Sequence, residues 1–154
     1  MAGFTTAVPT SFKGELPVAT HNFTATTGND FKVALGKTSP TGTYGAATTN
    51  YSNLTGNSDE VANGSGYTTG GYDFTAAQNI TPATSGTGAY WQWGTNPNWT
   101  SASFSTVGCI IYNASASNKA VYVGSFGGTQ TVTAGTLTLV QPSNGVGTSL
   151  LQLN

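Results

Sequence analysis

GCIIYN, residues 108–113, and KAVYVGSFG, residues 119–127, decide the fold. The first is a short continuous apolar run, which is typical of a strand that is covered on both faces. In the second, Val121 and Val123 share one face and Tyr122 lies on the other, which is the two-residue period of a β-strand. The SASN between them is a turn signal. The two segments therefore predict strands that are joined by a hairpin-type turn.

Strand-like patterns continue on both sides of this pair. In residues 30–35, apolar and polar residues alternate as in a half-buried strand. In residues 88–94, Trp91 and Trp93 share a face that we expect to lie in the core. Turn signals separate the segments at spacings of about 10 to 15 residues. The sequence therefore predicts an all-β protein, a single jelly-roll-like β-sandwich of about eight strands over residues 11–154. These further segments are, in order, DFKVAL (30–35), GAYWQWG (88–94), TLTLV (136–140) and SLLQL (149–153).

The first part of the chain differs from this pattern. SFKGELPVATHNF (11–23) places Phe12 and Leu16 four residues apart, but Pro17 interrupts the pattern, so we expect at most one helical turn. Residues 1–10 are uncharged and have no strand period. They predict an extended N-terminal arm, either frayed or laid across a neighbouring subunit.

Composition limits the classes of partner. Only 6% of the 154 residues are charged, against about 25% in ordinary soluble domains. Four lysines cannot form the basic face that nucleic-acid binding requires. No apolar run approaches the length of a membrane span, and the N-terminus has neither the basic start nor the apolar centre of a secretory signal. A net charge of −1 favours self-association.

The glycine-rich stretch DEVANGSGYTTGGYDF (59–74) has two interpretations. A phosphate-binding loop would end in Gly-Lys-Ser or Gly-Lys-Thr and open a helix. Here the stretch contains no lysine, and GYDFTAAQNI (71–80) after it keeps a strand period. We therefore predict turns and a strand start. Its acidic residues Asp59, Glu60 and Asp73 could form a glycosidase pair or a calcium site, but we favour solvated or turn-capping carboxylates.

No residue predicts catalysis. Cys109 lies in an apolar run and is expected to be a buried core residue, because a nucleophile would need a partner such as His21, which is distant in sequence. Among the aromatic residues, Trp99 stands just after a turn. Together with Tyr112 it could stack on a sugar, or both could belong to the core or to an interface. We expect no catalytic residue, metal or cofactor.

Six blocks of the sequence resemble, in order, a family of small virion proteins of tailed bacteriophages. The resemblance extends from about Ser11 to Leu153, and the order of the blocks is more specific than any single block. It implies a virion structural component without enzymatic activity. The blocks are SFKGEL (11–16), HNF (21–23), DFKVAL (30–35), DEVANGSGYTTGGYDF (59–74), NWTSASFSTVGCIIYN (98–113) and NKAVYVGSFGG (118–128).

The resemblance also implies where such a protein acts. We expect a capsid decoration (cement) protein that is made in the host cytoplasm, sits on the capsid surface and binds the major capsid protein and its own copies, with a trimer favoured. The alternative is a receptor-binding or carbohydrate-binding module of a tail fibre or tail tip. We expect the contact residues to be Phe4, Val8 and Phe12 near the N-terminus and Leu151 and Leu153 near the C-terminus. The two leucines could equally complete the protein's own sandwich.

Overall fold

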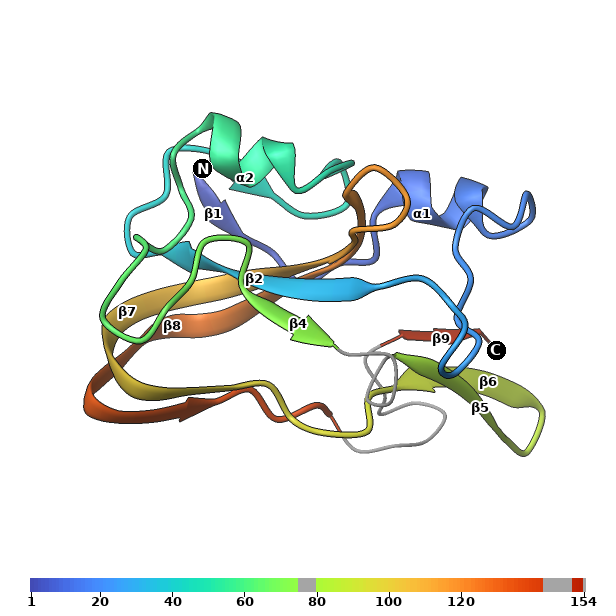
Figure 1. Ribbon diagram of the computed structural model, residues 1–154. Helices are drawn as coiled ribbons and strands as arrows, with labels where there is room; N and C mark the ends of the chain where they lie inside the picture. The colour runs from blue at the N-terminus through green and yellow to red at the C-terminus, as the bar shows by residue number, and fades with distance from the viewer. Residues whose placement is uncertain (75–79, 143–150, 154) are drawn as a thin grey trace.

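Four antiparallel strands form the central sheet, in the order β4–β2–β7–β8 (Figure 1). The structure is a computed structural model that describes residues 1–74, 80–142 and 151–153. Antiparallel strands dominate it, which confirms the all-β prediction. The four strands are β2 (Phe31–Lys37), β4 (Tyr72–Phe74), β7 (Asn98–Asn113) and β8 (Lys119–Thr138).

Smaller elements lie on either side of the central sheet. On one side in Figure 1 are two helices and a short parallel strand pair, and on the other is a three-stranded antiparallel sheet, β5–β6–β9. The helices are α1 (Thr10–Glu15) and α2 (Ser52–Gly56), and the parallel pair is β1 (Gly3–Phe4) with β3 (Thr43–Tyr44). The second sheet consists of β5 (Thr81–Ser85), β6 (Gly88–Gln92) and β9 (Leu151–Leu153).

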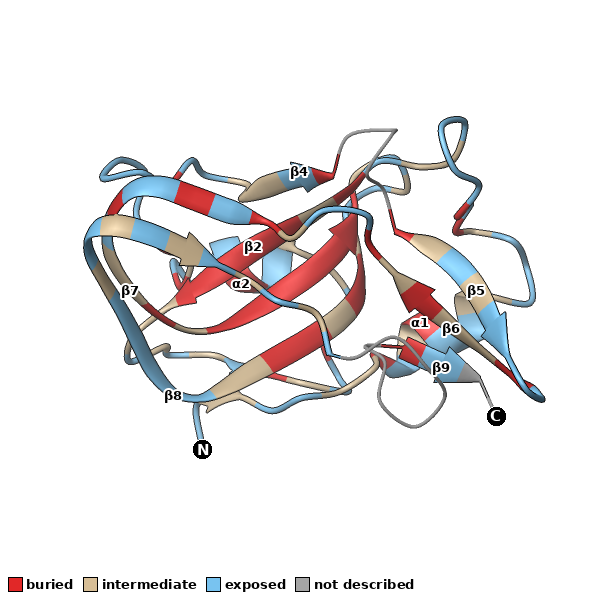
Figure 2. Cartoon of the chain, turned by 90° about the horizontal axis from the view of Figure 1, so that it is seen from below, coloured by how far each residue is buried: buried red, intermediate tan, exposed pale blue. Residues whose placement is uncertain are grey.

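The paired strands β7 and β8 are long and bend back over the molecule. The C-terminal half of β7 and the N-terminal half of β8 belong to the central sheet. The other two halves curve round beneath its face, as the views in Figures 1 and 2 both show. The register shifts at several places along this pair, including between Thr106 and Gly108. Such bulges bend and twist a strand pair.

Both faces of the central sheet are buried. Val33 and Ile111 pack in one core with the three tryptophans. Ala34 and Ile110 pack on the other face in a second core with Tyr44 and with Leu54 of α2. Burial on both faces confirms the prediction for GCIIYN. The expectation of a half-buried strand at 30–35 was wrong, because Ala34 is covered by the layer that contains β1, β3 and α2.

One predicted face assignment was also wrong. Val121 and Val123 belong to different cores, although the sequence alternation placed them on one face. Ile111 pairs with Tyr122 while Tyr112 pairs with Ala120, so Val121 is an extra residue in β8. A bulge of this kind turns the residues on its two sides to different faces.

The helices differ in part from expectation. α1 is slightly longer than the single turn that we expected, and it ends two residues before Pro17, which cannot continue a helix. α2 was not predicted at all. Its sequence, SNLTG, has low helix propensity, and the buried side chain of Leu54 attaches it to the second core.

Candidate contact surface

The N-terminal arm is extended, but the expectation that it is frayed or lies across a neighbour differs from what the structure shows. Residues Gly3–Phe4 pair in parallel with Thr43–Tyr44 of the same chain. Ala7 then forms a bridge to Val123 of β8, with both backbone hydrogen bonds at 2.9 Å. The arm therefore covers part of the outer edge of β8, an edge that would otherwise be open to another strand.

Phe4, one of the expected contact residues, packs inside its own chain. Its ring stacks on Tyr44 at 4.6 Å between centroids. It also lies over Gly36 and Gly108, which are register partners in β2 and β7, and an added Cβ at either glycine would meet the ring. Most of the ring is therefore already used within the chain.

Three of the other expected contact residues lie together, but Phe12 is 1% exposed and Leu151 is 3% exposed, and both belong to the first core. For Leu151 the alternative holds, that it completes the protein's own core. Val8, Phe12 and Leu151 line one surface pocket of about 120 Å³ between α1 and the β6–β9 strands. α1 lies above these strands at the right of Figure 1. The remaining expected residue, Leu153, belongs to β9, but its side chain lies outside the described residues. The rest of the lining consists of Lys13, Leu16, Trp91 and Gln152.

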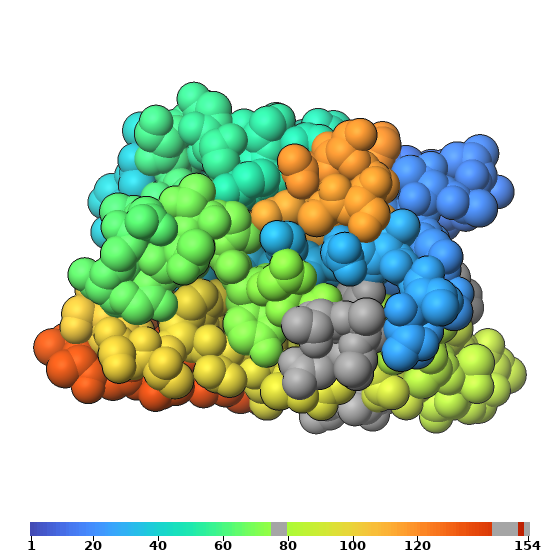
Figure 3. Space-filling model, viewed as in Figure 1, coloured from blue at the N-terminus to red at the C-terminus, as the bar shows by residue number. Residues whose placement is uncertain are grey.

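A network of polar side chains holds α1 against the turn between β7 and β8, which Figure 3 shows in orange beside the blue α1 region. Glu15 accepts hydrogen bonds from Lys119 and from His21 Nε2, the latter at 2.7 Å. His21 Nδ1 accepts a hydrogen bond at 3.0 Å from the buried Asn113, whose amide oxygen accepts from the Ala116 backbone N–H. The neutral His21 tautomer with its proton on Nε2 fits these bonds. The network fixes the position of α1, and with it one wall of the pocket.

The charges in this network support each other. Burial of the Glu15 carboxyl would raise its pKa, but the hydrogen bonds from Lys119 and His21 outweigh burial and hold that pKa below its ordinary value of 4.5. Both oxygens of this carboxylate are engaged within the chain. It is therefore not presented to a partner.

The expected sugar-stacking pair is not brought together. Trp99 is 5% exposed and lies in the first core, where Tyr67 stacks on it and the edge of Tyr72 contacts it. Tyr112 is 3% exposed and lies in the second core, stacked on Tyr51 at 4.4 Å. The central sheet separates the two rings, so they do not form one platform.

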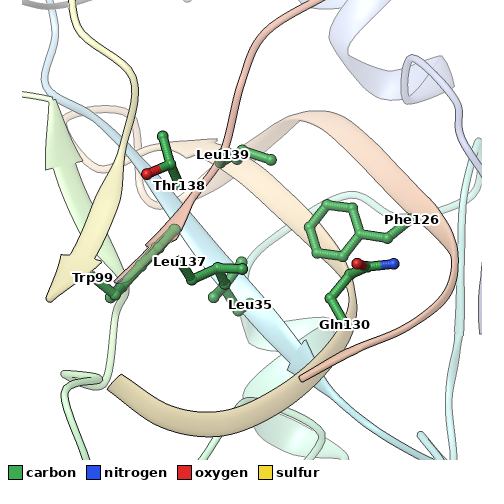
Figure 4. A pocket seen from close by; sticks show the side chains of 7 residues that line it. All are labelled: Leu35, Trp99, Phe126, Gln130, Leu137, Thr138 and Leu139. Atoms are coloured by element: carbon green, nitrogen blue, oxygen red, sulfur yellow. The ribbon is translucent and has the colours of Figure 1, made fainter. Parts of the chain in front are cut away.

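Trp99 does line a second pocket, beneath the bend of β7 and β8. Figure 4 shows Trp99 and Leu137 on one side of this space and Phe126 and Gln130 on the other. Its volume is about 120 Å³, and its walls are mainly apolar. Trp99 is too deeply buried to offer an open ring face to a sugar, and the volume is comparable to that of a cavity that accepts a single small apolar group.

Two of the three acidic residues in 59–74 have structural roles. Asp59 is fully buried and accepts hydrogen bonds from the backbone of Thr41 and Gly42 and from Tyr44 Oη at 2.6 Å. Glu60 accepts from Tyr51, Tyr67 and the Gly70 backbone. The third, Asp73, forms an exposed ion pair with Lys32. Asp59 thus caps a turn as predicted, except that it is buried rather than solvated.

The glycine-rich stretch is a turn, as the sequence predicts. Gly64 and Tyr67 exchange two backbone hydrogen bonds across Ser65 and Gly66, both of which have positive φ. Gly71, also at positive φ, precedes β4 and packs against the backbone of β2, where a Cβ would collide with Val33. Residues 75–79, where the expected strand period continues, lie outside the described residues.

Cys109 is buried in the first core, as predicted, and burial raises the pKa of its thiol to about 12. Both ring nitrogens of His21 are occupied by Glu15 and Asn113. The thiol therefore stays protonated and His21 has no free nitrogen to activate it. Among the described residues there is no group of three or more His, Cys, Asp or Glu side chains that could hold a metal ion.

The sequence pattern does not indicate that Trp91 forms one side of the pocket with Val8 and Phe12. Trp91 and Trp93 alternate correctly and both are buried, which confirms them as core residues. However, only the fold places Trp91 beside Phe12, and no spacing in the sequence relates them.

Comparisons with protein-family models, with curated proteins and with solved structures return no match. In the part of the chain that the structure describes, no helix is long and apolar enough to cross a membrane.

Proposed function

We propose that this protein is a structural component of a tailed-bacteriophage virion and that it decorates the capsid. In this role it binds the major capsid protein and its own copies on the shell surface, as a homo-oligomer with a trimer favoured, and it acts by association without catalysing a reaction. The observation that carries the proposal is a surface pocket with Val8 and the exposed Lys13 at its rim, above the buried side chains of Phe12 and Leu151.

Two further features support an associative role. The chain has few charges, and three of its four lysines already pair with carboxylates of the same chain. A surface of hydroxyl and amide groups is cheaper to desolvate than a charged one. Several modest contacts per copy would combine through effective concentration into firm attachment.

We further propose that the fold is a jelly-roll-like sandwich. Its first layer would be the central sheet. Its second layer would combine β5–β6–β9 with the returning halves of β7 and β8, which face the same core. This arrangement leaves α1 and the pocket at the rim, where neighbouring molecules can reach them.

Adding the purified protein back to phage shells that lack it tests the proposal. Saturable binding to the shells and a higher shell melting temperature are expected. Val8→Ser, at the pocket, should weaken binding several-fold. Val140→Ser is the matched control, because Val140 is 66% exposed and does not line this pocket. Failure of the wild-type protein to bind shells of its own phage would contradict the proposal.

The tail-fibre or tail-tip alternative predicts a different result. It requires an accessible aromatic surface for a glycan, whereas Trp99 and Tyr112 are buried in separate cores. Binding on a glycan array that is lost in Trp99→Ala, with a native-like circular dichroism spectrum for the variant, would favour that alternative over decoration.

A further inference from the structure

The N-terminal arm lies in a groove that the rest of the chain holds in shape. One wall is formed by residues 41–44, which are held by Asp59: its buried carboxylate accepts hydrogen bonds from two of their backbone N–H groups and from the Tyr44 hydroxyl. The floor consists of Gly36 and Gly108, which are register partners in the central sheet. None of these contacts involves the arm, so the groove remains formed when the arm leaves it.

The arm itself is attached by few contacts, and it contains no charged side chain. Gly3 and Thr5 each donate one backbone hydrogen bond to the wall, at 2.8 and 2.9 Å, and Ala7 exchanges two with Val123 of β8. Two side-chain hydrogen bonds supplement these. Pro9 joins the arm to α1 in an extended conformation, with φ −53° and ψ 139°, and it has no N–H that would lose a partner. The arm can therefore detach as a unit at this joint.

An empty groove would be unfavourable. The Phe4 ring occupies the space above Gly36 and Gly108, and glycines within strands have no side chain of their own to pack there. The Val123 N–H and C=O would also lose their partners at the edge of β8. These contacts require an arm in the groove, but the arm of a second, identical chain supplies the same ring and the same backbone groups. The contacts do not specify whose arm it is.

We propose that neighbouring copies of this protein exchange their N-terminal arms. The arm of one copy pairs with Thr43–Tyr44 and with Val123 of a second copy, and it places Phe4 above that copy's Gly36 and Gly108. Arms that are passed in one direction round a three-fold axis, or exchanged across a two-fold axis, fill every groove. Each copy is then bound to its neighbour by a segment that crosses between them.

Crowding decides between the two arrangements. In dilute solution each groove takes its own arm, because that arm is tethered beside it at a high effective concentration. The exchanged state forms the same contacts, so it becomes populated as the concentration of copies rises to comparable values. On a shell, copies lie side by side. The inference therefore deepens the proposed function by naming the surface that joins the copies, and it rests on that function only for this crowded setting.

Cysteines on the arm and in the groove distinguish the two arrangements. Ala7 and Val123 exchange both backbone hydrogen bonds, which places their Cα atoms about 5.5 Å apart, a separation that a disulfide spans. One chain carries Ala7→Cys and the other carries Val123→Cys. The only native cysteine, Cys109, is buried and does not compete. A disulfide between these positions then joins two chains, and it requires the arm of one chain in the groove of the other.

The two variants are mixed in equal amounts, equilibrated at high concentration, diluted and oxidised. We expect a disulfide-linked heterodimer whose yield rises with the protein concentration during equilibration. A mixture of Ala7→Cys with Thr84→Cys is the control for collisions in solution, because Thr84 is exposed on β5, across the central sheet from the arm (Figure 1). The yield of linked chains should be several-fold lower in this control.

A second measurement leaves Val123, which is fully buried, unchanged. A chain that lacks residues 2–8 is mixed with Gly36→Ala, which keeps its arm but has a Cβ where the Phe4 ring would lie. We expect the unfolding midpoint of the shortened chain to rise towards that of the wild type, and a one-to-one complex to form in sedimentation. Adding Phe4→Ala to the Gly36→Ala chain removes the ring and should remove most of this gain.

The inference is overturned if folded Ala7→Cys and Val123→Cys chains join no more often than the control pair. Where Val123→Cys does not fold, it is overturned if the second mixture unfolds as the sum of its separate components. These outcomes are distinct from failure of the proposed function. A protein that exchanges arms in solution but does not bind phage shells retains the exchange and loses the decoration role. A protein that stabilises shells while its shell-bound copies form no such disulfide retains the role and loses the exchange.

Discussion

The ring of Phe4 stacks on the ring of Tyr44, with 4.6 Å between their centroids and 30° between their planes. The same ring occupies the space above Gly36 and Gly108, where any larger residue would place a carbon atom. Phe4 is thereby held between an aromatic ring and two paired backbones. The N-terminal arm can pack here because residues 36 and 108 are glycines, which have no side chain to occupy the space of the Phe4 ring.

Gly36→Ala tests this arrangement. The added Cβ would meet the Phe4 ring, so we expect the free energy of unfolding in urea to fall by about 1–3 kcal/mol, as in other overpacked sites. In a Phe4→Ala background the same substitution should cost much less, because contacting residues are coupled. Gly14→Ala is the control, since a Cβ there meets nothing and α1 gains helix propensity. Equal costs of Gly36→Ala in both backgrounds would contradict the contact.

Asp59→Asn should destabilise the protein and change its response to acid. Asn cannot accept all the hydrogen bonds that Asp59 receives, so a loss of about 2–4 kcal/mol is expected at neutral pH.

Burial raises the pKa of Asp59, but the bonds from Tyr44, Thr41 and Gly42 outweigh it and hold that pKa well below the ordinary 3.8. The unfolded chain therefore binds the proton first, and the contribution of Asp59 is complete above about pH 4 and is lost as the pH falls further. Between pH 5 and pH 2, the free energy of unfolding in urea should fall more steeply with decreasing pH for the wild type than for Asp59→Asn. Parallel curves would contradict this.

Alkaline pH should destabilise the folded protein through ionisation of the Tyr44 hydroxyl. Burial, and then its hydrogen bond to Asp59, raise the pKa of the Tyr44 hydroxyl from 10.0 to about 12. The unfolded chain loses this proton first, so the contribution is complete below pH 10 and is lost as the pH rises towards 12. From pH 9 to pH 12, the free energy of unfolding in urea should fall faster for the wild type than for Tyr44→Phe, because the phenylalanine has no proton to release. Equal slopes would contradict the assignment.

The strands could be predicted from the sequence because their alternation is local. Val33 and Leu35 share a face in both the prediction and the structure, and the unbroken apolar run around Ile110 gave burial on two faces correctly. Val121 and Val123 were misplaced because a bulge depends on how two strands pair, and the alternation within one strand does not contain that information.

The sequence does not reveal how the residues near its two ends are arranged in the fold. Val8, Phe12 and Leu151 are apolar residues near the two ends of the sequence, which is why they were chosen, and the fold brings them to one pocket. Phe4 belongs instead to the second core, because the glycines that accommodate it lie on strands more than thirty residues away. Contacts over such separations leave no periodic pattern in a single sequence.

Deleting residues 2–8 should destabilise the single chain and promote self-association. The deletion removes Phe4 from its place beside Tyr44 and exposes the Val123 N–H and C=O that Ala7 now satisfies. An open strand edge pairs readily with another chain. We expect a lower unfolding midpoint and a sedimentation coefficient that rises with protein concentration.

Deletion of residue 2 alone, which leaves the pairing from Gly3 onwards in place, is the control. A synthetic peptide of residues 1–9 should partly restore the midpoint, since it can occupy the vacated edge. If the deleted chain were as stable and as monomeric as the control, the arm would contribute nothing to its own fold, and its contacts would have to serve another purpose.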